Sequence, residues 1–407
     1  MLPVPDGEYS QQQQIFSLIL NQIMPPFFLI VPIMASSVMA ASSFVGEKEK
    51  RTLETLLYSP LSLRQLFQSK ILAGLSVGMM ISYISFAAML LVVEMEVFFL
   101  TGNPECYAYS EAWAEHNEWK GAKSDNKEEW KYSYGESDDY VLFGDYQICF
   151  QTYADLYTVK PDSGKIARAR EVMEYQMSTD KNDYWWWADG LYMVMPVMTK
   201  MYKLTGNPLY LEKLHEYWTY ANSIMYDSEE GLYYRDGKYI YPKHKSVNGK
   251  KDFWARGDGW VLAALAKVLK DLPETDQYRQ EYIDRFQTMA KSVAACQQPE
   301  GYWTRSMLDP EHAPGPETSG TAFFTYGLLW GMNNGLLDKA AYQPVVMKAW
   351  NYLTTVALQP DGRIGYVQPI GEKAIPGQVV DANSTANFGV GAFLLAACEM
   401  VRFLNAD

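Results

Sequence analysis

The pattern of hydrophobic and polar positions along the chain changes near residue 100. Residues 15–46 and residues 71–93 contain no charged side chain. Each run exceeds the roughly 20 apolar residues that a helix needs to cross a bilayer. We therefore predict two spanning helices, at residues 24–45 and 71–93, in a membrane segment that occupies residues 1–99.

From residue 100 onward, the apolar positions recur with the period of amphipathic helices. Loops rich in Gly, Pro, Asn and Asp separate these helices. Two short segments, residues 231–236 and 365–368, have the pattern of brief hairpins. The expected helices are residues 104–119, 144–158, 164–176, 189–204, 208–225, 259–270, 277–297, 319–334, 340–357 and 385–404.

An internal repeat links two of these helices. The sequence LTGNP occurs at residues 100–104 and again at 204–208, each time before a helix rich in Tyr and containing Trp. Gly ends one helix with a positive φ angle, and Pro suits the first turn of the next. Repeated helical hairpins stack into closed toroids. The sequence therefore predicts an all-α fold, an (α/α)6 barrel over residues 100–407 that lacks its first hairpin.

Charge is distributed unevenly along the chain. The formal net charge is −13, of which residues 1–99 contribute only −2. The acidic remainder argues against a nucleic-acid partner, which requires a basic surface. The first 119 residues have five basic side chains, all between the two apolar runs: Lys48, Lys50, Arg51, Arg64 and Lys70.

Positive residues favour the cytoplasmic side of a membrane. We therefore expect the loop between the spans in the cytoplasm and the barrel outside it, anchored on the periplasmic side. If the N-terminal segment is an artefact of the gene model, the barrel would instead be a soluble cytoplasmic or periplasmic protein.

Cysteine and histidine spacing gives no sign of a metal site. The four cysteines and four histidines are scattered, without a CxxC or Cys/His pattern. Buried, unpaired cysteines are the simplest interpretation. We expect no metal and no cofactor.

Four clusters combine aromatic rings with polar side chains at predicted helix starts. They are GDYQICFQTYADLY (144–157), WWWADGLYM (185–193), FWARGDGW (253–260) and PETSGTAFFTYGL (316–328). Sugars stack on aromatic rings, and carboxylates carry general acid–base chemistry. Asp145, Asp189 and Asp258 could alternatively be helix caps. Three Trp residues before Asp189 favour an apolar setting that raises its pKa, as an acid catalyst requires, whereas Asp145 should remain an anion.

The segment FVGEKEKRTLETLLYSPLS (44–62) resembles the cytoplasmic coupling region of ABC-transporter type-2 permeases. The resemblance covers residues 10–95, a fraction of a complete permease. It implies an ABC ATPase subunit as a partner if the segment is a real permease fragment. The alternative is an interfacial amphipathic helix with ordinary Glu/Lys pairs.

The four clusters together resemble glycoside hydrolase family 105, the unsaturated rhamnogalacturonyl hydrolases, which are related to family 88. The resemblance covers residues 100–405. It implies hydration of the C4=C5 double bond of an unsaturated uronyl residue in a pectin-derived oligosaccharide. Asp189 would be the general acid and then the base, and Asp145 would orient substrate or water. The predicted substrate-binding residues are Trp187, Trp254, Arg256, Trp260, Arg235, Glu317, Ser319 and Thr321, with Arg256 opposite the uronate.

Two departures from the family pattern stand out. Arg235 lies where family members often have a His, and the loop 177–185 has no His. Two other functions remain open: a permease fragment with an appended carbohydrate-binding toroid, and another toroid activity such as a mannosidase or an epimerase. Epimerases depend on a pair of His residues, which the scattered histidines disfavour.

Overall fold

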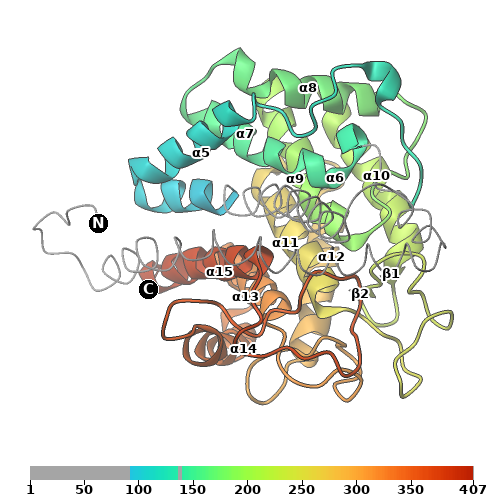
Figure 1. Ribbon diagram of the computed structural model, residues 1–407, viewed down its shortest axis with the longest axis vertical. Helices are drawn as coiled ribbons and strands as arrows, with labels where there is room; N and C mark the ends of the chain where they lie inside the picture. Colours follow the sequence, from blue (N-terminus) through green and yellow to red (C-terminus); the bar gives the residue numbers. More distant parts are fainter. Residues whose placement is uncertain (1–91, 136–139, 407) are drawn as a thin grey trace, which may run out of the picture. The chain divides into compact units, whose positions relative to one another are not determined.

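The structure is a computed structural model that describes residues 92–135 and 140–406 (Figure 1). The chain divides into two units, residues 88–358 with 364–407, and residues 1–87 with 359–363. The described part of the second unit is a turn in which the Gly362 N–H donates to the Gln359 carbonyl at 2.8 Å. The predicted spans at 24–45 and 71–93 lie outside the described residues, apart from 92 and 93.

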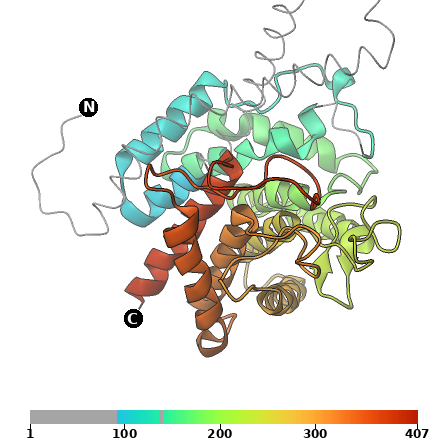
Figure 2. The same ribbon diagram turned by 60° about the horizontal axis from the view of Figure 1, so that its bottom comes forward.

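In the larger unit, inner helices alternate with outer ones along the chain. The inner helices pack on one another in sequence order, and Figures 1 and 2 both show the red α15 beside the orange α13. The inner helices are α7 (Cys149–Val159), α9 (Ala188–Thr205), α11 (Ala255–Asp271), α13 (Thr318–Asn333) and α15 (Asn387–Asn405). The outer helices, buried along one face, are α5 (Pro104–His116), α8 (Ser163–Met177), α10 (Leu209–Met225), α12 (Arg279–Ala295) and α14 (Lys339–Tyr352).

The LTGNP repeat has the same local structure at both positions. Gly102 and Gly206 have φ angles of 70° and 68°, which only Gly adopts without strain. The Asn103 side chain then accepts the Glu105 N–H at 3.1 Å, and the Asn207 side chain accepts the Leu209 N–H at 3.1 Å. Each Gly therefore ends one helix, as predicted. Pro104 lies in the first turn of α5, also as predicted, whereas Pro208 is the N-cap of α10, which begins at Leu209.

All ten predicted helices are present, with shifted ends. The helix predicted at 144–158 consists of α6 (Gly144–Gln147) and α7, and the one predicted at 340–357 ends in a π turn, Leu353–Ala357. The hairpin predicted at 231–236 pairs β1 (Tyr226–Asp227) with β2 (Leu232–Tyr233), antiparallel, with Tyr226 opposite Tyr233.

The prediction that the barrel lacks its first hairpin needs correction. Residues 92–101 are helical, and the side chains of residues 92–97 are buried. This helix precedes α5, and the rings of Phe98 and Tyr107 lie 5.7 Å apart across the turn. Helix 92–101 and α5 therefore form a helical hairpin ahead of α7.

Glu96 ties helix 92–101 to the barrel. Its carboxylate accepts hydrogen bonds from Lys270 of α11 at 2.6 Å and from Arg402 of α15 at 3.2 Å. These charges lower the pKa of Glu96 against the opposing effect of burial. The predicted domain boundary at residue 100 thus falls inside the larger unit, because residues before it pack with the barrel helices.

One described helix, α15, is long and apolar enough to cross a membrane. Most of its side chains are buried within the larger unit, against α13 in particular. Its apolar composition is that of a core helix.

Candidate active site

The N-terminal ends of three inner helices are fixed by the same kind of backbone contact. The Ala188 N–H at the start of α9 donates to the Arg235 carbonyl at 2.8 Å. At the start of α11, Ala255 donates in the same way to Arg305 at 3.0 Å, and Thr318 of α13 donates to Tyr366 at 2.9 Å. Each inner helix therefore begins against a loop that follows the next outer helix, and these loops carry side chains to the helix starts.

Asp189 lies in the first turn of α9. Its side chain is 16% exposed, and its buried Oδ2 atom has no hydrogen-bond partner among the described residues. Burial raises the pKa of Asp189, and the charges of Arg235 and Arg256 oppose the rise. An uncommitted carboxyl oxygen with a raised pKa is what a general acid requires.

Asp145 lies in α6, close enough to Asp189 for their charges to interact. Crowding by protein atoms raises the pKa of Asp145 to about 7, and the Asp189 charge adds to the rise, although the side chain remains in contact with water. Both effects act against the expectation that Asp145 remains an anion, which stays a prediction. The two carboxyls are an electrostatically coupled pair, in which a charge on Asp189 disfavours ionisation of Asp145.

The three consecutive Trp residues have different surroundings. Trp185 packs against Tyr217 of the outer helix α10, with ring centroids 5.2 Å apart. Trp187 stacks on Phe143 at 4.6 Å, beside the start of α6, and Trp186 lies under the Arg235 guanidinium at 5.7 Å. The aromatic run therefore forms an apolar wall at the starts of α6 and α9. Trp187 lies between these two helices, which carry Asp145 and Asp189.

Arg235 reaches Asp189 from the loop after β2. Its Nε atom is 3.5 Å from Asp189 Oδ2. Asp258, in the first turn of α11, accepts the Tyr233 N–H at 2.8 Å and so holds this loop in place. Asp258 is completely buried, and burial raises its pKa well above the ordinary value. Asp258 thus neither caps its own helix nor faces the site, but positions the segment that carries Arg235.

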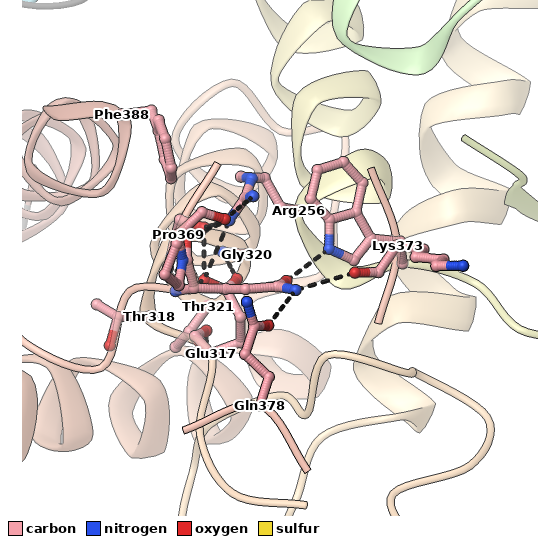
Figure 3. A network of polar contacts seen from close by, with 12 residues as sticks. Arg256, Glu317, Thr318, Gly320, Thr321, Pro369, Lys373, Gln378 and Phe388 are labelled. Carbon is pink, nitrogen blue, oxygen red and sulfur yellow. Dashed lines mark hydrogen bonds and ion pairs between the residues drawn. The ribbon is translucent and has the colours of Figure 1, made fainter. Parts of the chain in front are cut away.

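Arg256 is buried in a second network next to the carboxyl pair (Figure 3). Its guanidinium donates to the carbonyls of Gln368 at 2.9 Å and Pro369 at 3.0 Å. Trp254 and Phe388 lie 4.3 Å and 4.4 Å from it, on their ring faces. Burial lowers the pKa of Arg256 to about 10, so it remains charged at neutral pH. Its donors hold the loop 366–379, here named the rim loop.

The predicted residues of the PETSGT motif belong to the same network. Glu317 is the N-cap of α13, and its carboxylate accepts the N–H groups of Gly320 at 2.6 Å and Gln368 at 3.1 Å. Ser319 Oγ donates to Glu317 at 2.7 Å, and Thr321 Oγ1 accepts the Trp303 N–H at 3.1 Å. All three side chains are buried and bonded within the protein. Their contact with substrate remains a prediction.

Trp260 lies deeper in the barrel. Its ring packs against Tyr192 at 4.8 Å and Phe323 at 4.4 Å. Its buried indole Nε1 has no hydrogen-bond partner among the described residues. The ring lies one helical turn below Arg256 and forms part of the core between α9, α11 and α13.

Sequence reasoning missed three residues around Arg235. Asp236 accepts a hydrogen bond from Arg235 at 2.6 Å, and Glu372 lies 3.4 Å from the same nitrogen. Burial and the neighbouring Glu372 charge raise the pKa of Tyr239. Asp236 could have been found as the polar neighbour of Arg235. Glu372 belongs to none of the sequence motifs of the site, because it is far from Arg235 in the sequence and approaches it only in the folded chain.

A cavity of about 620 Å³ lies at the opposite end of the barrel, where the inner helices end. Its charges are paired: Lys200 lies 2.5 Å from Asp155, and Lys203 lies 2.8 Å from Asp271. We therefore place the candidate active site at the helix starts and not at this cavity. In the described ranges, no cluster of three or more His, Cys, Asp or Glu side chains could hold a metal ion.

An α/α toroid with a coupled pair of carboxyls and aromatic walls at its helix starts defines a glycoside-hydrolase type of protein. The family comparison agrees, since the profile of Glycosyl Hydrolase Family 88 matches residues 87–404, and the chain belongs to this family. A profile described as ABC-2 family transporter protein matches residues 5–102. Both predicted resemblances are thereby confirmed.

Individual relatives fit this assignment. An unsaturated 3S-rhamnoglycuronyl hydrolase of Formosa agariphila is 40% identical over 245 residues, covering 58% of this chain and 64% of that protein. The chain thus spans less than two thirds of this curated relative. A solved glycosyl hydrolase family 88 structure from Bacteroides vulgatus is 72% identical, with a TM-score of 0.76, covering 78% of this chain and 91% of the other.

Two further structures extend the comparison. One, named a polysaccharide lyase, is 82% identical with a TM-score of 0.76, and covers 79% of this chain and 91% of the other. A possible member of family 105 from Salmonella enterica has a TM-score of 0.63 and 20% identity, covering 79% of this chain and 83% of the other. That likeness shows the shared fold alone.

Proposed function

We propose that the barrel hydrates the C4=C5 double bond of an unsaturated uronyl residue linked to rhamnose. The observation that carries the proposal is Asp189 at the start of α9: its buried Oδ2 has no hydrogen-bond partner among the described residues, lies 3.5 Å from Arg235 Nε, and is close enough to Asp145 for their charges to interact. The named activity of the Formosa relative supports the same substrate class.

The reaction needs one group that first gives and then takes a proton. The protonated Asp189 carboxyl donates to C4 while positive charge develops at C5 and the ring oxygen. Its conjugate base then takes a proton from the water that attacks C5. The resulting hemiketal opens, and the bond between the former uronyl C1 and the rhamnose oxygen breaks. One water is consumed and the double bond disappears.

Asp145 and Arg235 have supporting roles in this proposal. The Asp145 carboxyl orients water or substrate, and its proton affinity depends on the charge of Asp189. Arg235 faces the uronate carboxylate in this proposal, because its Nε lies 3.5 Å from Asp189 Oδ2 and has no hydrogen-bond partner among the described residues. Arg256, which was expected opposite the uronate, acts indirectly in this proposal, because its donors bind the Gln368 and Pro369 carbonyls and so hold the rim loop.

Deuterium labelling tests the proposed reaction. The full-length chain, kept in solution with detergent, is incubated in heavy water with an unsaturated uronyl-rhamnose disaccharide. We expect one deuteron at C4 and free rhamnose in equal amounts, both detectable by nuclear magnetic resonance. Release of rhamnose with the double bond retained would contradict hydration. A reaction that creates double bonds in a polymer would instead indicate a lyase.

For residues 1–99, we propose two spans at 24–45 and 71–93 that anchor the barrel outside the cytoplasm. The match of residues 5–102 to an ABC-2 transporter profile and the charge asymmetry support this. An ABC ATPase would then be the candidate partner of the loop 48–70. Protease added to intact cells should digest the barrel, and complete protection would contradict this orientation.

A second candidate function is a permease fragment with the toroid as a carbohydrate-binding module. The ABC-2 match is the observation that favours it. A binding module would retain the substrate unchanged, so the deuterium experiment separates the two functions.

A further inference from the structure

Three carboxylates surround the guanidinium of Arg235. Asp236 Oδ2 lies 2.6 Å from its NH1 nitrogen, Glu372 Oε2 lies 3.4 Å from the same nitrogen, and Asp189 Oδ2 lies 3.5 Å from Nε. The single positive charge therefore faces three acidic groups. With Asp189 protonated for catalysis, Asp236 and Glu372 remain as the anions that compete with an anionic sugar for Arg235.

Of the three carboxylates around Arg235, only that of Glu372 can be displaced without exposing a buried charge. The Asp236 side chain is 2% exposed, and its other oxygen accepts the Lys238 N–H at 2.7 Å. Asp189 is half-buried in the first turn of α9. Glu372 is 46% exposed, and its contact with Arg235 is longer than a hydrogen bond to a charged group normally is. Its displacement would expose no buried charge.

The rim loop carries Glu372 between two fixed points. On one side, Gln368 is held by Arg256 and Glu317 (Figure 3), and its side chain accepts the Trp254 indole N–H at 2.8 Å. On the other side, the Gln378 carbonyl accepts a hydrogen bond from Arg305 at 2.8 Å. The Gln368 amide also donates to the Lys373 carbonyl at 2.9 Å, so the backbone beside Glu372 is held and the exchange needs only a rotation of the half-exposed Glu372 side chain.

We propose that Glu372 is a specificity-determining residue whose carboxylate takes, on Arg235, the place of the substrate's uronate carboxylate. This inference rests on the proposed function and goes further, because it assigns Arg235 as the anion receptor and Glu372 as its displaceable stand-in. Both carry the same chemical group, so a uronate can replace Glu372 with the loss of one ion pair and the gain of another. A neutral sugar offers Arg235 no such exchange.

Steady-state kinetics of Glu372→Gln test this assignment. Glutamine keeps the size of the side chain but removes the competing charge. We expect KM for the unsaturated uronyl substrate to fall about two- to five-fold, the range of a partly exposed ion pair, with kcat within two-fold. Glu372→Asp should retain the KM of the parent. Glu274→Gln, which removes an exposed charge beyond the end of α11, is the matched control and should change neither constant.

A double variant distinguishes competition from a structural effect. In the background of Arg235→Gln, Glu372→Gln should no longer lower KM, because the receptor for which the two carboxylates compete is gone. An unchanged or higher KM in the single variant, or the same fall with and without Arg235, would overturn the assignment.

Calorimetric binding of D-glucuronate keeps the inference testable if the chain turns over no substrate. Glu372→Gln should bind glucuronate about two- to five-fold more tightly than the parent, with no gain for D-glucose. If the chain lacks the proposed activity but Glu372→Gln still binds glucuronate more tightly, the proposed reaction is rejected and the role of Glu372 is retained. Equal glucuronate affinity in parent and variant would reject the role of Glu372.

Discussion

Arg235 Nε lies 3.5 Å from Asp189 Oδ2, and neither atom has a hydrogen-bond partner among the described residues. The arrangement leaves an acid and a cation side by side with donors and acceptors available to a third group. A uronate placed there would put its carboxylate on Arg235 and its double bond near Asp189. The pair therefore links recognition of the substrate's charge to the proposed proton transfer.

Replacing Arg235 should change both the affinity and the pH profile. We expect Arg235→Gln to lower kcat/KM by roughly 10- to 100-fold, the effect of losing a charged hydrogen bond. The Arg235 charge lowers the pKa of Asp189, so its loss should raise that pKa further. The alkaline limb of the kcat profile should therefore move to higher pH. An unchanged limb would mean that Asp189 is not the titrating acid.

Asp145→Asn should alter stability in a pH-dependent way. The ordinary pKa of 3.8 applies to the unfolded chain, and the folded value is about 7. Since the folded state binds the proton more tightly, stability from this group is full below pH 3.8 and is lost as pH rises through 7. Asparagine avoids that loss. The Tm difference between variant and parent should therefore grow in favour of the variant from pH 5 to pH 8, and a constant difference would contradict the raised pKa.

Glu96→Ala should destabilise the barrel by about 2 kcal/mol, because Lys270 and Arg402 lose a buried charged acceptor and only partly regain water. Urea unfolding followed by Trp fluorescence measures the change. Glu115→Ala, on the exposed face of α5, is the control and should have little effect. Equal stability of the Glu96 variant and the parent would show that residues before 100 do not belong to the barrel.

Arg256→Lys should loosen the rim loop. A lysine lacks the planar fork that reaches the Gln368 and Pro369 carbonyls together, so we expect a loss of about 2 kcal/mol in stability and faster proteolysis within 366–379. KM should rise as well. Arg279 offers a matched control, since its guanidinium also binds two carbonyls, those of Leu269 and Leu272, at the other end of α11. Arg279→Lys should lose stability without a change in KM.

The helices were predictable because their signals are local. Apolar periodicity and the LTGNP caps depend on neighbouring residues, and the structure places these helices within a few residues of the expected ranges. The first hairpin was missed because helix 92–101 follows directly on an apolar run, and its buried Glu96 is neutralised by residues far along the chain.

The site was only partly predictable for the same reason. Asp145, Asp189 and Trp187 were found because aromatic residues flank the carboxyls in the sequence. Glu317 was selected only as a substrate-binding residue, and the structure shows it as the N-cap of α13, two and three residues before the N–H groups that it accepts. The contact between Arg235 and Glu372 depends on tertiary structure, and no local sequence pattern predicts it.

The rate at which the ultraviolet absorbance of the C4=C5 double bond disappears, compared between the parent and Asp189→Asn, tests the central claim most directly. Asparagine keeps the shape of the side chain but cannot give or take the proton. We expect the parent to remove the absorbance and the variant to be slower by at least about 10², with substrate binding retained. An equal rate in the two proteins would contradict the assignment of Asp189 as the catalytic acid and base.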